Sequence, residues 1–117
     1  MNPNETNITM LEQEAPQEEN LVLKFGKPYV FDGKEYAEVD LSGLMDTTGA
    51  DLAAVGKIVA RTGITSPMPE MSMEFSQHMA ARVSKKPVEF FQRMPARDAI
   101  RLKNMVTGFL YGGDGDN

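Results

Sequence analysis

Hydrophobic and polar positions alternate along two neighbouring runs near the start of the chain, as they do in β-strands. Residues 21–31, LVLKFGKPYVF, are rich in β-branched and aromatic side chains, and residues 35–41, EYAEVDL, place apolar side chains at every second position from Ala37. Asp32 and Gly33 lie between the runs, and this dipeptide favours a tight turn because glycine adopts a positive φ without strain. The pattern predicts a single β-hairpin.

Two details of this hairpin stay open at the level of sequence. A two-residue loop pairs Phe31 with Lys34, whereas a four-residue loop pairs Phe31 with Tyr36. Gly26 and Pro28 interrupt the first run, and because proline cannot donate a ladder hydrogen bond, they indicate an edge strand or a bulge. An isolated hairpin is marginal in water, so one apolar face must pack on the rest of the domain. The residues predicted to form this face are Val30, Ala37, Val39 and Leu41.

The apolar period lengthens after the hairpin, which predicts helices. The first helix runs from Thr48, a candidate N-cap followed by Asp51 in the first turn, to a stop at Gly63. Gly56 lies inside this helix and costs about 1 kcal/mol relative to alanine. We interpret it as a site of close backbone contact.

Further helical segments follow. Residues 69–84 are predicted to form a second helix, Pro87 opens a short helical turn, and Pro95 opens the last helix, which is expected to end at Gly112. The pattern as a whole predicts an α+β fold: an N-terminal β-hairpin packed on a small bundle of three to four helices, with a disordered N-terminal tail. The apolar residues that recur every four positions in the second helix are Met71, Phe75, Met79 and Val83.

Charge divides the chain unevenly. The first twenty residues carry five glutamates and no Lys or Arg, whereas residues 21–117 carry twelve acids and twelve bases, so the tail holds the whole net charge of −5. Such a polar, acidic segment lacks the apolar surface that folding needs. We therefore expect residues 1–20 to be a disordered acidic tail, residues 21–112 to form a single α+β domain and residues 113–117 to be a flexible C-terminus.

Three features favour a soluble protein of a reducing cytoplasm. The longest uncharged stretch, residues 104–113, has ten residues, against the roughly eighteen that a membrane-spanning helix requires. No basic start precedes an apolar run at the N-terminus, and the chain contains no cysteine for a disulfide. We expect no membrane association.

Candidate chemistry is sparse. His78 is the only histidine and cysteine is absent, so the chain lacks the residues of a nucleophile–base pair or a zinc site. The C-terminal GGDGDN begins like a calcium loop but stops before the glutamate that such a loop requires. The sequence therefore predicts no enzyme, no catalytic residue, no cofactor and no metal site.

A basic stretch from Arg82 to Lys103 keeps one alternative open. Seven bases lie there against Glu89 and Asp98, enough to contact phosphates in a small DNA-binding regulator. The acidic tail, the pI near 4.8 and the lack of aromatic residues interleaved with the bases argue against nucleic acid. We favour a solvated helix face, or a patch that docks an acidic partner or the protein's own tail.

Methionine is the strongest compositional bias. Six of the nine methionines lie between Met68 and Met105, and this unbranched, polarizable side chain suits both irregular cores and surfaces that fit several partners. We interpret Met71, Met79 and Met105 as core, and Met68 and Met73 as an exposed surface. The residues predicted to contribute to partner contact are Met68, Met71, Met73, Phe75, Phe90 and Phe91.

The order of these segments resembles the small tail assembly chaperones of long-tailed bacteriophages and prophages. Members of that family begin with an apolar strand and a proline, continue through a turn into an alternating strand that ends near a DL pair, and start a helix with TG-x-DL. The likeness extends over residues 21–111. The stretches that carry it are Leu21 to Phe31, Gly33 to Leu41 within FDGKEYAEVDLSGL, and Thr48 to Leu52 within TGADLAAVGKI.

The resemblance implies a non-enzymatic assembly factor in the cytoplasm of the bacterial host. Such a chaperone binds the tape measure protein, keeps its long helical segments from aggregating, helps to recruit tail tube protein, and is absent from the mature virion. A longer, frameshifted form of the protein is implied as a further partner. Exposed strand edges and a methionine-rich face make a homo-oligomer plausible, and a structural tail component is the remaining alternative.

Overall fold

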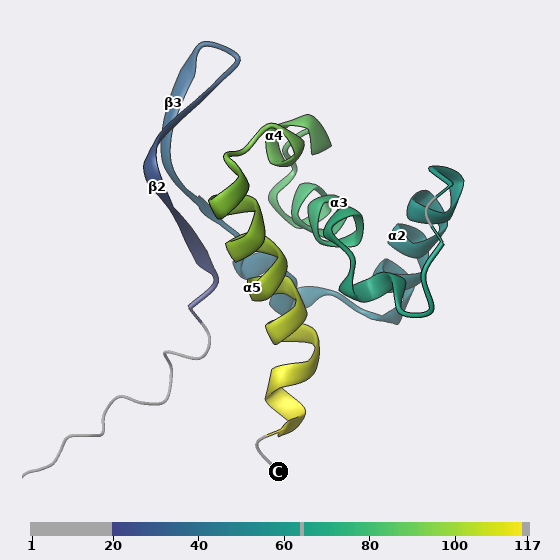
Figure 1. The fold of residues 1–117 in the computed structure, drawn as a ribbon. Coiled ribbons are helices and arrows are strands. Elements are labelled where there is room, and N and C mark those ends of the chain that lie inside the picture. The colour runs from purple at the N-terminus through teal and green to yellow at the C-terminus, as the bar shows by residue number, and fades with distance from the viewer. Residues whose placement is uncertain (1–19, 64, 116–117) are drawn as a thin grey trace, which may run out of the picture.

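The computed structural model describes residues 20–63 and 65–115, with side chains up to residue 112. A two-stranded antiparallel hairpin is followed by helices (Figure 1), which confirms the predicted α+β architecture. The predicted acidic tail lies outside the described residues apart from Asn20, as does the predicted flexible C-terminus from residue 116 onward. The elements in chain order are β2 (Val22–Phe31), β3 (Lys34–Asp40), the 3-10 turn η2 (Ser42–Asp46), α2 (Gly49–Arg61), the 3-10 turn η3 (Pro69–Met71), α3 (Met73–Ser84), α4 (Val88–Gln92) and α5 (Ala96–Gly115).

The hairpin has the register of a two-residue loop. Phe31 pairs with Lys34 across Asp32 and Gly33. Both turn residues have positive φ, 53° and 76°, as the hairpin turn whose twist matches the flanking strands requires. Of the two registers that the sequence allows, the four-residue loop is excluded.

A bulge divides the hairpin into two halves. After the pair Lys24–Glu38 the ladder resumes at Tyr29–Tyr36, which leaves residues 25–28 of β2 outside the regular pairing. A glycine and a proline lie within this segment, where the missing proline donor breaks no ladder hydrogen bond. In β2 the buried side chains stay at odd positions on both sides of the bulge, whereas in β3 the inward-facing position changes from Val39 to Tyr36.

The buried face of the hairpin therefore differs from the prediction near the tip. Val39 and Leu41 are buried as predicted, but Val30 is 64% exposed and Ala37 is also exposed. Beyond the bulge Tyr36 turns inward instead and packs against the core. The prediction is wrong at Ala37 because it continued the alternation of β3 from Val39 past the point where the bulge changes it, and wrong at Val30 because it placed Val30 on the same face as Ala37.

Aromatic rings join the hairpin tip to α4. The Phe90 ring lies at the centre of this cluster and is almost fully buried. The hydroxyl group of Tyr29 donates to the carbonyl oxygen of Phe90 at 2.7 Å, which satisfies a polar group that would otherwise be buried without a partner. Three rings of the hairpin meet Phe90 edge-to-face, at centroid distances of 5.0, 5.3 and 5.0 Å: those of Tyr29, Phe31 and Tyr36.

Helix α2 has the ends that the sequence predicts. The Thr48 side chain accepts a hydrogen bond from the Ala50 N–H (3.2 Å), and the Asp51 carboxylate accepts one from the Thr48 N–H (2.8 Å), which completes a capping box. Gly63 follows the helix with a φ of 86°. Gly56 does not mark a close contact, since a Cβ placed there would meet no atom within 4 Å; that prediction is wrong.

Helix α3 lies between α2 and α5 (Figure 1). Its N-terminus is capped by Ser72, which accepts a hydrogen bond from the amide three residues later at 3.1 Å, and Lys85 ends it in the left-handed conformation. Pro87 precedes α4 as predicted, whereas α5 continues to Gly115 instead of ending at Gly112. Buried residues at the centre of the helical layer include Val55, Val59, Phe75, Met79, Leu102 and Val106.

The first turn of α5 is tied to the bulge of β2. Asp98 is buried there and accepts hydrogen bonds from the Gly26 N–H (3.2 Å) and from the Arg101 guanidinium (2.5 Å). Arg101 also donates to the carbonyl oxygen of Lys24. Backbone groups beside and within the bulge thus find partners on a helix instead of on a neighbouring strand.

Candidate functional site

The structure separates the six residues predicted to contact a partner into three groups. Met68 precedes the η3 turn and Met71 is its last residue, with 46% and 40% of their surface exposed. Met73, the first residue of α3, is half-buried against the core. The other three are buried, because they pack inside the helical layer and the aromatic cluster: Phe75, Phe90 and Phe91. Of these three, only Phe75 lines the hollow described below. We correct the predicted contact set accordingly.

The core interpretation of the methionines is right at Met79, which is fully buried, and at Met105, which packs half-buried on the core. It is wrong at Met71. The four-residue spacing extended the stripe of α3 by one turn toward the N-terminus, but the chain there is the separate η3 turn, which ends before the Ser72 cap. Met73, predicted to be exposed, is more covered than Met71.

An apolar hollow of about 390 Å³ opens beside η3. We call it the apolar hollow. It is bounded by three helices and by the η3 turn, and Met68 and Met71 are the residues immediately before and after the two η3 residues that line it. Its apolar lining comes from residues distant in sequence: Leu52, Ala53, Gly56, Pro69, Phe75, Leu110 and Tyr111.

Gly56 has a different role from the one predicted. It lies on the α2 wall of the apolar hollow, with open space where a side chain would stand. A larger residue at this position would project into the hollow, so glycine leaves room there for a ligand side chain. Glycine at this position destabilises the helix by about 1 kcal/mol relative to alanine, but it leaves the apolar surface of the hollow concave.

One polar contact crosses the rim of the apolar hollow. The Tyr111 hydroxyl group, on the last turns of α5, donates to Glu70 Oε2 on η3 at 2.5 Å. This hydrogen bond holds the pKa of Glu70 below its usual range, and the same carboxylate raises the pKa of Tyr111. At neutral pH the contact therefore joins a protonated phenol to an ionised carboxylate, the stronger kind of hydrogen bond.

Sequence inspection missed the α2 and α5 walls of the apolar hollow. Leu52 and Leu110 follow helical periods and were indistinguishable from ordinary core positions, yet both are only partly buried. Gly56, a glycine inside a helix, is the one local sign of this site in the sequence, and it marks open space in the hollow instead of a close backbone contact. Which turns of α2 and α5 face each other depends on the packing of α3 between them, and no local pattern specifies that.

Much of the basic segment 82–103 is engaged within the molecule. Arg82 pairs with Asp51 at 2.8 Å, and Arg101 is held by its buried acidic partner on α5. The Lys86 ammonium lies 4.9 Å from the centre of the Tyr36 ring and 5.3 Å from that of the Phe90 ring, within cation–π range. These contacts reduce the charge available to phosphates.

Groups that could hold a metal ion do not gather in the part of the chain that the structure describes. Within residues 20–63 and 65–115, no three His, Asp or Glu residues lie close enough to hold a metal ion. His78 is half-buried on α3. No helix among the described residues is long and apolar enough to cross a membrane. The chemistry visible here is that of an apolar binding surface.

Comparison with known proteins returned no match: no protein-family model, no curated protein and no solved structure is similar to this chain. The apolar hollow and the exposed methionines of the adjoining η3 turn, together with the three sequence stretches around the hairpin and the start of α2, bear on the function.

Proposed function

We propose that the protein is a tail assembly chaperone of a long-tailed bacteriophage or prophage, which binds the tape measure protein and helps to recruit tail tube protein without catalysing a reaction. The observation that carries the proposal is the pair of exposed methionines beside the apolar hollow. The order of strand, FDGKEY turn, second strand and TGADL helix start supports the choice of family.

The apolar hollow suits a helical client. A long helix presents apolar side chains at i, i+3, i+4 and i+7, and these are recognised by laying one face of the helix into a groove. Methionine side chains adapt to different apolar shapes because they are unbranched and have three rotatable bonds. Met68 and Met71 would therefore let one surface hold successive, non-identical stretches of a long protein.

A capture experiment with paired variants tests this proposal. The double variant Met68→Ser, Met71→Ser removes two partly exposed apolar side chains that binding would cover. We therefore expect the affinity for tape measure segments to fall about tenfold, equivalent to about 1.4 kcal/mol. Ile100→Ser is the control, because Ile100 is similarly exposed but lies about 15 Å along α5 from Leu110, which lines the apolar hollow, whereas Met68 and Met71 adjoin the lining residues Pro69 and Glu70. Isothermal titration calorimetry would measure both.

Circular dichroism should show that both variants keep the helical content of the parent. Equal affinity of the methionine variant and the parent for every tape measure segment would refute the assignment of this surface. Equal losses in the methionine variant and in Ile100→Ser would point to a general loss of apolar surface instead of a defined site.

Two alternatives have their own tests. A DNA-binding regulator would show a gel-shift affinity that falls steeply with salt, whereas the internal pairing of Arg82 and Arg101 predicts weak binding. A structural tail component would remain in purified virions, whereas the proposed chaperone would be absent from them.

A further inference from the structure

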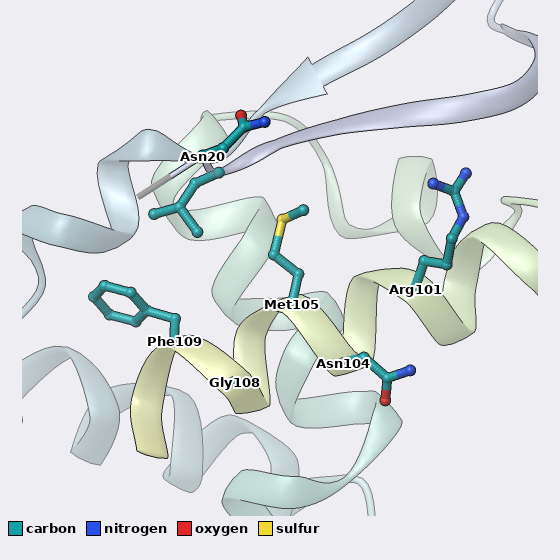
Figure 2. Close-up of a pocket in the computed structure, with 7 residues that line it drawn as sticks. Asn20, Arg101, Asn104, Met105, Gly108 and Phe109 are labelled. Carbon is teal, nitrogen blue, oxygen red and sulfur yellow. The ribbon is translucent and has the colours of Figure 1, made fainter. Parts of the chain in front are cut away.

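A second hollow, of about 410 Å³, lies between the start of β2 and helix α5. We call it the strand–helix hollow. Met105 and Phe109 point from α5 toward the beginning of the strand (Figure 2). Both side chains are only partly buried although they touch the core, so apolar surface on this side of α5 lacks a full cover among the described residues.

The strand–helix hollow has an apolar floor and a basic end. Leu21, Met105 and Phe109 form the floor, while Arg101 stands at the rim with nearly half of its side chain exposed. Lys27 and Arg97 line a further recess along the same seam between β2 and α5. Three bases thus face one acid, Asp98, in this seam, and Asp98 is already bound by Arg101.

The chain itself supplies a segment of matching chemistry. Residues 8–14, ITMLEQE, place Ile8, Met10 and Leu11 directly before Glu12 and Glu14. The apolar residues of this segment match the apolar floor of the strand–helix hollow, and the glutamates that follow them match its basic end. The acidic tail also carries the entire net charge of the protein, while the rest of the chain is balanced, so the excess of bases in the seam has the sign that complements the tail.

Connectivity brings this segment to the strand–helix hollow. Asn20, the first residue that the structure describes, lines that hollow (Figure 2). Five residues separate it from residue 14, and such a connection spans up to about 17 Å when extended. Pro16 lies within the connection, and proline favours the first central position of a chain reversal.

We infer that residues 8–14 of the same chain dock in the strand–helix hollow. Met10 and Leu11 cover the apolar floor, and the glutamates that follow face Arg97 and Arg101. The docked segment shields the exposed side of α5 from other apolar surfaces. This contact lies on a different face from the proposed client site and does not depend on the function proposed above.

Disulfide trapping tests the inference directly, because the protein has no cysteine of its own. The double variant Gln13→Cys, Asn104→Cys places one thiol within the docking segment and one at Asn104, an exposed residue that lines the strand–helix hollow. Gln13→Cys, Ser42→Cys is the matched control. Ser42 is exposed and lies near the point where the tail joins the domain, since the Leu41 N–H donates to the Leu21 carbonyl oxygen at 2.7 Å.

At low protein concentration, oxidation should form the intramolecular 13–104 bond about tenfold faster than the 13–42 bond, because docking raises the effective concentration of one thiol near the other. Mass spectrometry would follow the loss of two hydrogens in the monomer. Adding Met10→Ser and Leu11→Ser, or Glu12→Gln and Glu14→Gln, should bring the 13–104 rate down toward that of the control pair, whereas adding Glu5→Gln should leave it unchanged.

Equal trapping rates for the two pairs would overturn the inference. A 13–104 rate that ignores the apolar and acidic substitutions would overturn it as well, since the bond would then report only the proximity of a tethered chain. Trapping that produces dimers in preference to monomers would assign the strand–helix hollow to the segment of a second copy. Circular dichroism of each variant would verify that the domain itself is intact.

Discussion

The change of face within the hairpin can be tested by truncating two valines of the same ribbon. Val39 is 3% exposed in the half nearest the helices, and Val30 is 64% exposed beyond the bulge. Val39→Ala removes buried apolar groups worth about 1.6 kcal/mol at about 0.8 kcal/mol per group, and the cavity left behind raises the cost to about 2 kcal/mol. Val30→Ala should cost about 0.5 kcal/mol, because most of that side chain already meets water.

Thermal unfolding by circular dichroism gives a large enough signal to separate the two variants. For a domain of this size, 1 kcal/mol shifts Tm by about 4–8 °C, so Val39→Ala should melt roughly 8–16 °C below the parent and Val30→Ala within a few degrees of it. Urea unfolding would give the free energies. A cost for Val30→Ala equal to that of Val39→Ala would place both residues on one buried face and refute the bulge.

Three further predictions follow from contacts described above. Phe90→Ala should lower the free energy of unfolding by about 3–5 kcal/mol in urea titrations, because it empties the centre of the aromatic cluster; a loss below 1 kcal/mol would contradict that role. The hydrogen bond from the Thr48 N–H, and after it the one from the Arg82 guanidinium, keep the pKa of Asp51 below its ordinary value. These contacts therefore stabilise the fold at pH values above the ordinary pKa of aspartate, and the stabilisation is lost as the pH falls through the lower pKa of the folded state. In urea unfolding measured across a series of acidic pH values, the free energy of unfolding of Asp51→Asn should therefore fall less steeply with decreasing pH than that of the parent. Gly56→Ala should stabilise α2 by up to about 1 kcal/mol yet weaken client capture in calorimetry, and unchanged affinity would show that the apolar hollow does not need that opening.

The element order and the helix ends could be predicted from sequence because local rules decide them. The Asp32-Gly33 turn, the Thr48 cap and Pro87 each act within a few residues, and the structure has all three as predicted. The inward face of the hairpin tip could not be predicted in the same way. Residues 25–28 lie outside the ladder, and one of them, Gly26, has its amide bound by Asp98 of α5, far along the chain.

The candidate site was predictable only in part, for a related reason. Exposure of Met68 agrees with its position off the helical stripe, but the phenylalanines chosen beside it are core residues. An apolar side chain in sequence looks the same whether it meets a partner or the protein's own interior. The aromatic residues of the hairpin and those of α4 each looked unpaired along the chain, and they turn out to pack on one another around Phe90.

The hydrogen bond between the Gly26 amide and Asp98 bears on the timing of folding during synthesis. It joins residues 72 positions apart, and the Tyr29–Phe90 contact spans 61. The hairpin strands are translated early, but a two-stranded hairpin is marginal without a surface to pack on, and that surface is made last. The hairpin therefore stays unstable, with its apolar face exposed, until α4 and α5 have left the ribosome. Structure in this domain is expected to appear in one late step instead of growing from the N-terminus.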